Sequence, residues 1–141
     1  MKVAKHVSGQ LVHLLVGDEL IVPGLPQHKM RYVGPIGSGG EDVVDPAKGQ
    51  PARLVHFNFI PNRHLLLVGE RGTTDWNETL QIQARAREVV ERGVVNLTLH
   101  QNCEHIGSYI RHGEPESPQL KFWVGTAAAV AIGFAIFGGR K

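Results

Sequence analysis

The stretch "NCEHIGSYIRHG", residues 102–113, places the chain's single cysteine, Cys103, beside an apolar pattern of helical period. Ile106 and Ile110 are four positions apart and therefore share one face of a helix. Asn102 is a residue type that favours the N-cap, where its side chain accepts a hydrogen bond from the first turn. The spacing predicts a helix over about residues 102–111 that carries the cysteine at its N-terminal end.

A longer helix is expected upstream of this stretch. Apolar residues recur there with an i, i+4, i+7, i+8 spacing, at Ile82, Ala86, Val89 and Val90. Gly93 follows as a C-terminal stop signal.

The first half of the chain is typical of short strands. The expected strands are residues 11–16 and 19–22, joined by a tight turn at Gly17-Asp18, and two more at 52–60 and 64–70. The Gly/Pro/Asp-rich segment 34–51 is expected to be a loop. A small sheet followed by two helices predicts an α+β domain over residues 1–113.

The C-terminus has a different character. Residues 114–121 form a polar linker with two prolines, and residues 122–139 are an uncharged run bounded by Lys121 and Arg140-Lys141. Such a run is at the short end of the length that crosses a bilayer. It predicts a single-pass tail anchor, with the main domain facing the cytosol. The formal net charge of +2 does not indicate nucleic acid as a partner.

Cys103 can be interpreted in three ways. At a helix N-terminus, the dipole and the unpaired N–H groups favour the thiolate, which is the nucleophilic form. His105 follows too closely on the same helix to serve as the base, so a base is expected from elsewhere in the chain. A buried thiol is the second interpretation. A zinc site with His100 and His105 is the third, but it lacks a further pair of ligands.

The block Asn102-Cys103-Glu104-His105 resembles the signature of the lecithin–retinol acyltransferase-like thiol enzymes. The nearest branch is the phospholipase A and acyltransferase family, also called HRAS-like suppressors. The strands, the helix ending near residue 92 and the C-terminal apolar run are collinear with that family, although only the Asn-Cys-Glu-His block is specific.

The resemblance implies a small papain-related fold with an antiparallel sheet and a helix that bears the cysteine. It implies that Cys103 attacks a glycerophospholipid ester and forms a thioester. The acyl group then passes to water, phosphatidylethanolamine or a lysophospholipid. No metal or cofactor is implied, and the implied partners are the phospholipid and the membrane.

The sequence departs from the family at its histidines. The family's general base lies on the strand just before a Gly-Asp turn, and anchoring on Val16-Gly17-Asp18 puts Leu11 at that position and Pro23 at the position of the second histidine. Neither residue can transfer a proton.

Three accounts of the missing base are open. His13, two residues along the same strand, takes its place. His64, in "RHLLLVGE", is the base in a rearranged strand order. In the third account the base is lost, and the chain is a catalytically degenerate paralogue that acts as a membrane-tethered binding protein, or is related to viral non-structural proteins with an H-box and an Asn-Cys motif. Three further histidines carry no signal beyond their residue type and are interpreted as ordinary residues; they are His28, His56 and His112.

Overall fold

A computed structural model of the chain describes residues 2–24, 27–37, 40–47, 49–94 and 101–113. The side chains of residues 101–104 lie outside this description, as do the predicted linker and the predicted membrane span. The described part is an α+β arrangement of one seven-stranded sheet and two α-helices, which confirms the coarse fold class. No helix within it is long and apolar enough to cross a bilayer.

The sheet has the strand order β2-β1-β7-β3-β4-β5-β6. Neighbouring strands are antiparallel except β1 and β7, which are parallel. The strands are β1 (Val3–His6), β2 (Leu11–His13), β3 (Glu19–Val22), β4 (His28–Gly34), β5 (Asp42–Asp45), β6 (Arg53–His56) and β7 (Leu67–Val68). Two 3₁₀ helices, η1 (Phe57–Phe59) and η2 (Arg63–Leu65), connect β6 to β7. The predicted strands 52–60 and 64–70 are therefore shorter than expected.

Both helices form where the sequence predicts them. Helix α1 (Trp76–Arg92) begins after Asp75, whose side chain accepts a hydrogen bond from the backbone N–H of Glu78, and ends at Gly93 with φ +64°. Its predicted apolar face is buried. Helix α2 (Gln101–His112) begins one residue before Asn102, so Asn102 falls inside the helix and is not its cap.

The predicted hairpin between residues 11–16 and 19–22 is wrong. Strand β2 pairs with β1, whereas β3 pairs with β4 and β7. Asp18 explains the difference, because its buried carboxylate accepts hydrogen bonds from the backbone N–H groups of Leu15 and Gly72 and from Arg71. The Gly17-Asp18 turn is thereby held against a distant part of the chain.

The predicted loop over residues 34–51 contains strand β5. The Asp42 carboxylate accepts hydrogen bonds from the backbone N–H groups of Ile36 and Gly37, and these bonds close a turn that brings β5 back against β4. Strand β4 itself was not predicted. This strand pair matters most for the site described below.

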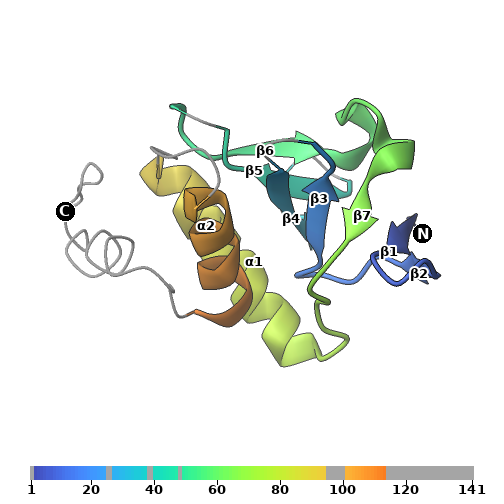
Figure 1. The fold of residues 1–141 in the computed structure, drawn as a ribbon. Coiled ribbons are helices and arrows are strands. Elements are labelled where there is room, and N and C mark those ends of the chain that lie inside the picture. Colours follow the sequence, from blue (N-terminus) through green and yellow to red (C-terminus); the bar gives the residue numbers. More distant parts are fainter. Residues whose placement is uncertain (1, 25–26, 38–39, 48, 95–100, 114–141) are drawn as a thin grey trace.

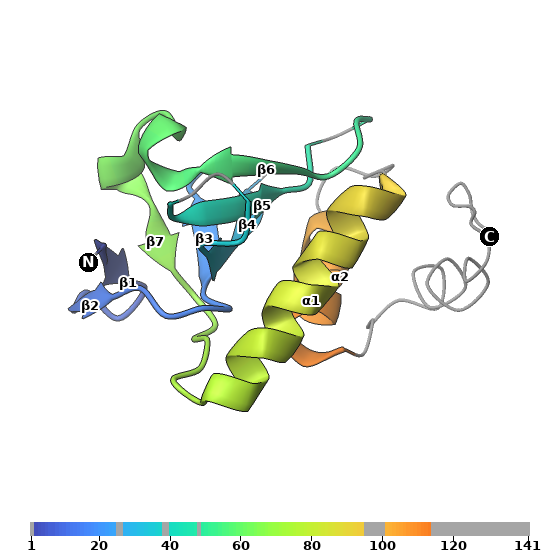
Figure 2. The same ribbon diagram turned by 180° about the vertical axis from the view of Figure 1, so that it is seen from behind.

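Figures 1 and 2 show α1 and α2 side by side against one part of the sheet, with β1 and β2 at the far end from the helices. One core fills the space between sheet and helices, and includes Val33, Val44, Ile82, Ile106 and Ile110. A second core lies on the opposite face of the sheet, and includes Leu20, Met30, Tyr32, Val43, Phe57 and Leu66.

Candidate functional site

Cys103 is the third residue of α2, and its backbone lies in the first helical turn. The predicted position at a helix N-terminus thus agrees with the backbone, and the thiol itself lies outside the described residues, as do the side chains of Asn102 and Glu104. His105 is half-buried, and its Nδ1 is a buried atom without a hydrogen-bond partner in the described part of the chain.

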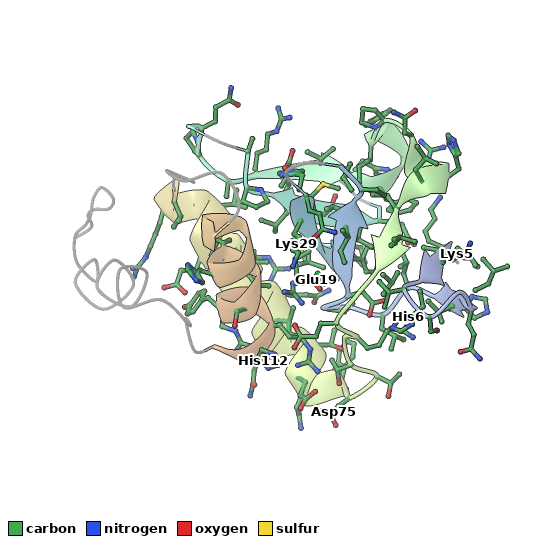
Figure 3. The ribbon with its side chains drawn as sticks, in the orientation of Figure 1. Lys5, His6, Glu19, Lys29, Asp75 and His112 are labelled. Carbon is green, nitrogen blue, oxygen red and sulfur yellow. The ribbon has the colours of Figure 1, made fainter. Side chains whose placement is uncertain are left out.

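Helix α2 lies along β4 and runs in the same direction. At its middle, Ile106 lines the same small pocket as Lys29, and Gly107 is so close to Arg31 that an added Cβ would be 2.7 Å from the guanidinium. At its C-terminal end, His112 reaches Glu70; Figure 3 shows His112 well apart from Lys29. The first turn of α2 is therefore at the end of the sheet where β4 begins.

The two predicted bases lie elsewhere. His13 is exposed on β2, the edge strand, with three strands between it and β4. Four strand spacings of about 4.8 Å correspond to roughly 19 Å along the sheet. His64 is exposed in η2, within the connection from β6 to β7. The structure does not bring His13 or His64 to helix α2.

A different histidine carries a carboxylate partner at the end of the sheet where α2 begins. His28, the first residue of β4, has its Nε2 2.6 Å from Oδ1 of Asp45, the last residue of β5. The side chains are 35% and 14% exposed. A guanidinium nitrogen of Arg53 on β6 is 3.5 Å from the other oxygen of Asp45.

The electrostatics of this group favour a charged Asp45. Burial raises the pKa of the carboxyl, but the hydrogen bond and charge of His28 and the nearby Arg53 outweigh it, so the pKa lies below its ordinary value. A carboxylate on Nε2 fixes the orientation of the imidazole and stabilises its protonated form.

Sequence reasoning missed His28, although a signal was present. The family's base was placed five residues before the valine of Val16-Gly17-Asp18, and the same spacing can be counted from a Val-Gly pair that is not followed by aspartate, Val33-Gly34. Counting back five residues from Val33 in "HKMRYVG" gives His28. The chain has Val-Gly pairs also at Val68 and Val124, where the same spacing gives an arginine and a glutamine. The pair at Val33 is the one whose spacing yields a histidine.

The His28–Asp45 pair and helix α2 lie on opposite faces of β4. His28 and Met30 project toward the second core. Arg31, the next residue along the strand, projects to the opposite face, toward Gly107 of α2. Because His28 is the first residue of its strand, its ring is at the rim of the sheet and not in its centre.

A cavity of about 460 Å³ opens beside His28 and Asp45 on the second-core face. Its lining is mostly apolar, and consists of Val22, Pro23, His28, Met30, Asp45, Arg53, Val55, Phe59, Ile60, Pro61, Asn62, Leu65 and Leu66. This volume is within the range of small-molecule sites, roughly 300–1,000 Å³.

Comparison of the chain with family models, with curated proteins and with solved structures finds no match. Within the described residues, no three His, Cys, Asp or Glu side chains are grouped as metal ligands.

Proposed function

We propose that the chain is a cysteine-dependent acyl-transferring enzyme of the phospholipase A type, with Cys103 as nucleophile and the His28–Asp45 pair as base and orienting group. The observation that supports this most directly is that α2 runs along β4 with its N-terminal end toward the start of the strand, where the His28–Asp45 pair lies on the other face. A nucleophile, a base and a group that orients the base are the parts that such chemistry needs.

The proposed reaction has two steps. The imidazole of His28 takes the proton of the Cys103 thiol, and the thiolate attacks the carbonyl carbon of a glycerophospholipid ester. The carbon–oxygen ester bond breaks, and the lysophospholipid oxygen leaves with the proton from the imidazolium. Water, an amine or a hydroxyl then attacks the thioester, gives its proton to the imidazole, and releases the thiolate with the acyl group on the acceptor. The charged Asp45 stabilises the imidazolium in both steps.

The papain-related fold that the Asn102-Cys103-Glu104-His105 block implies is part of the same proposal. In such a fold, backbone N–H groups at the start of the cysteine-bearing helix are aimed at the oxyanion of the tetrahedral intermediate. The direction of α2 along β4 supports this part of the proposal, since its N-terminal end points to the end of the sheet that holds His28.

A second candidate function is supported by the face on which His28 lies. His28 lines the cavity on the face of β4 opposite to α2, which favours a catalytically silent protein that binds lipid or protein without turnover. The two candidates differ in one measurable property, which is a Cys103-dependent thioester.

The test is incubation of the full chain in lipid vesicles with phosphatidylcholine that carries a labelled acyl chain. We expect labelled protein and labelled fatty acid from the wild type, and neither from Cys103→Ser. His28→Gln should also abolish the label, whereas His13→Gln and His64→Gln are matched controls that should keep it. Label that persists in Cys103→Ser, or that is absent from the wild type, overturns the enzyme. Label that depends on His13 or His64 but not on His28 overturns the assignment of the base.

Residues 122–139 are proposed as the tail anchor, which would hold the domain at the lipid that it acts on. Deletion of residues 122–141 should move the protein from the membrane pellet to the supernatant in a carbonate wash. A truncated chain that stays in the pellet contradicts the anchor.

A further inference from the structure

We infer that the cavity beside His28 and Asp45 binds a single-chain amphiphile with a carboxylate head, such as a long-chain fatty acid. This site shares His28 and Asp45 with the proposed catalytic site, but binding there does not depend on turnover. The inference is drawn from three properties of the cavity: its apolar lining, the charged group on one wall, and its exposed apolar rim.

The apolar lining comes from several elements of the fold. Met30, Ile60 and Leu66 are nearly fully buried and form the inner wall, and Val22 and Val55 add half-buried aliphatic surface. A volume of about 460 Å³ is in the lower half of the usual range for ligand sites. Aliphatic walls favour a hydrocarbon ligand, because each buried methylene contributes about 0.8 kcal/mol. The small volume favours a single chain.

The charged wall determines the head group. His28, Asp45 and Arg53 form one connected group in the lining, with one carboxylate between two basic side chains. When the imidazole is protonated, the group carries a net positive charge. Arg53 is 61% exposed, and its guanidinium has five N–H donors. One of its nitrogens is 3.5 Å from a carboxylate oxygen of Asp45, which leaves the donors on the other nitrogens for a ligand. A carboxylate can therefore bind the arginine without displacing Asp45.

The rim of the cavity exposes two large apolar side chains that the cores do not use. Phe59 is 79% exposed and Leu65 is 53% exposed, and both belong to the cavity lining. They come from η1 and η2, the two short turns that separate β6 from β7. Apolar side chains at such a position can close over a bound hydrocarbon chain and shield it from water.

Photolabelling of the full chain in vesicles tests the inference. The probe is a sixteen-carbon fatty acid with a diazirine on the chain, and the control probe is the alcohol of the same length. Trypsin cleaves after Arg53, Arg63 and Arg71, so the cavity is reported by the peptides of residues 54–63 and 64–71. We expect label on these two peptides, and about tenfold less with the alcohol, the loss of one charge-assisted hydrogen bond.

Variants separate the cavity from the rest of the surface. Val55→Trp fills the cavity and should reduce the label at least fivefold. Val12 is a half-buried residue of β2 outside the cavity, and Val12→Trp should leave the label unchanged. Phe59→Ser changes only an exposed side chain and should reduce the label without affecting the fold. Trp76→Ser, 70% exposed at the start of α1, is its matched control.

Three results would overturn the inference: label confined to peptides after residue 71, which contribute no residue to the lining, label that survives both Val55→Trp and Phe59→Ser, or equal label from the alcohol. Cys103→Ser should keep the label. Loss of the cavity label in a chain that still forms the Cys103 thioester contradicts the inference alone. Label without any thioester supports the inference and contradicts the proposed enzyme.

Discussion

Two histidine–carboxylate pairs in this fold have nearly the same bond and different surroundings. The distance from Nε2 of His28 to a carboxylate oxygen of Asp45 is 2.6 Å, and the distance from Nε2 of His112 to a carboxylate oxygen of Glu70 is 2.5 Å. Asp45 is 14% exposed and lies beside a cavity, whereas His112 and Glu70 are both more than 40% exposed. Bond length alone therefore does not indicate which histidine does chemistry.

The third member of each group makes the contrast clearer. Arg53, beside Asp45, is 61% exposed. Arg31, beside Glu70, is only 4% exposed. Its guanidinium donates a hydrogen bond to the carbonyl of Gly17 and lies against Gly107 of α2. Glu70 thus connects a buried cation of the sheet to the last turn of α2, which is a structural task. His28, Asp45 and Arg53 instead line a cavity on the other face of β4, which a ligand can enter.

The largest expected effect is on catalysis. His28→Gln should reduce Cys103-dependent release of labelled fatty acid by at least 100-fold, since general acid–base groups contribute about 10²–10⁴. His112→Gln should leave the rate within about threefold, because its imidazole is at the far end of α2. Initial rates on vesicle-bound phosphatidylcholine are the measurement. Equal losses in the two variants would remove the functional half of the comparison.

The second effect is on stability, where the Glu70 pair is expected to matter more than the Asp45 pair. Glu70→Gln leaves the buried Arg31 without its carboxylate and should lower the free energy of unfolding by about 1–2 kcal/mol, less than a fully buried pair because Glu70 is partly exposed. Asp45→Asn should cost less than about 1 kcal/mol, since its two partners can turn to solvent. Urea unfolding followed by circular dichroism gives both values. A larger loss in Asp45→Asn would contradict the structural role assigned to Glu70.

The third effect is on the acid side of the stability profile. Burial raises the pKa of Glu70, but hydrogen bonds from His112 and Arg31 and their charges lower it further, below its ordinary value of 4.5. A carboxyl with a depressed pKa in the folded state adds stability above its unfolded pKa, and this stability is lost as the pH falls through the folded pKa. The free energy of unfolding should therefore fall from pH 5 to pH 3.

Asp45, with a pKa below its ordinary value of 3.8, contributes to the same fall. The Glu70→Gln variant should show a shallower decline than the wild type, and the double variant with Asp45→Asn a shallower one still. Urea titrations at several pH values measure the slopes. Parallel profiles for the three proteins would show that neither carboxyl is coupled to folding in this way.

The same contrast explains what the sequence could and could not predict. Helix α1 follows from local signals, namely the cap at Asp75, the buried stripe that includes Ile82 and Ala86, and the stop at Gly93. Its register needs no distant partner. The position of Cys103 near the start of α2 was predictable from the helical spacing of Ile106 and Ile110, although the expected cap at Asn102 was wrong.

Strands β4 and β5 could not be found in this way. The helix-facing positions of β4 include Lys29 and Arg31, so the strand lacks an apolar alternation. Arg31 is buried only because Glu70, 39 residues away, and the carbonyl of Gly17 accept its hydrogen bonds. Strand β4 was not predicted and β5 was predicted as loop, so the pairing of His28 with Asp45 was not expected, and the Val16 anchor placed the family's base position at Leu11.

The smallest effect compares the two arginines. Arg53→Gln should change the free energy of unfolding by less than about 0.5 kcal/mol, because an exposed ion pair at 3.5 Å is screened by water and contributes little. Arg31→Gln removes a buried cation with two acceptors and should cost several times more. In the photolabelling assay the order is expected to invert, since Arg53 lines the cavity and Arg31 does not. An Arg53→Gln variant that is destabilised as much as Arg31→Gln would mean that the His28 group, like the Glu70 group, serves the fold before it serves a ligand.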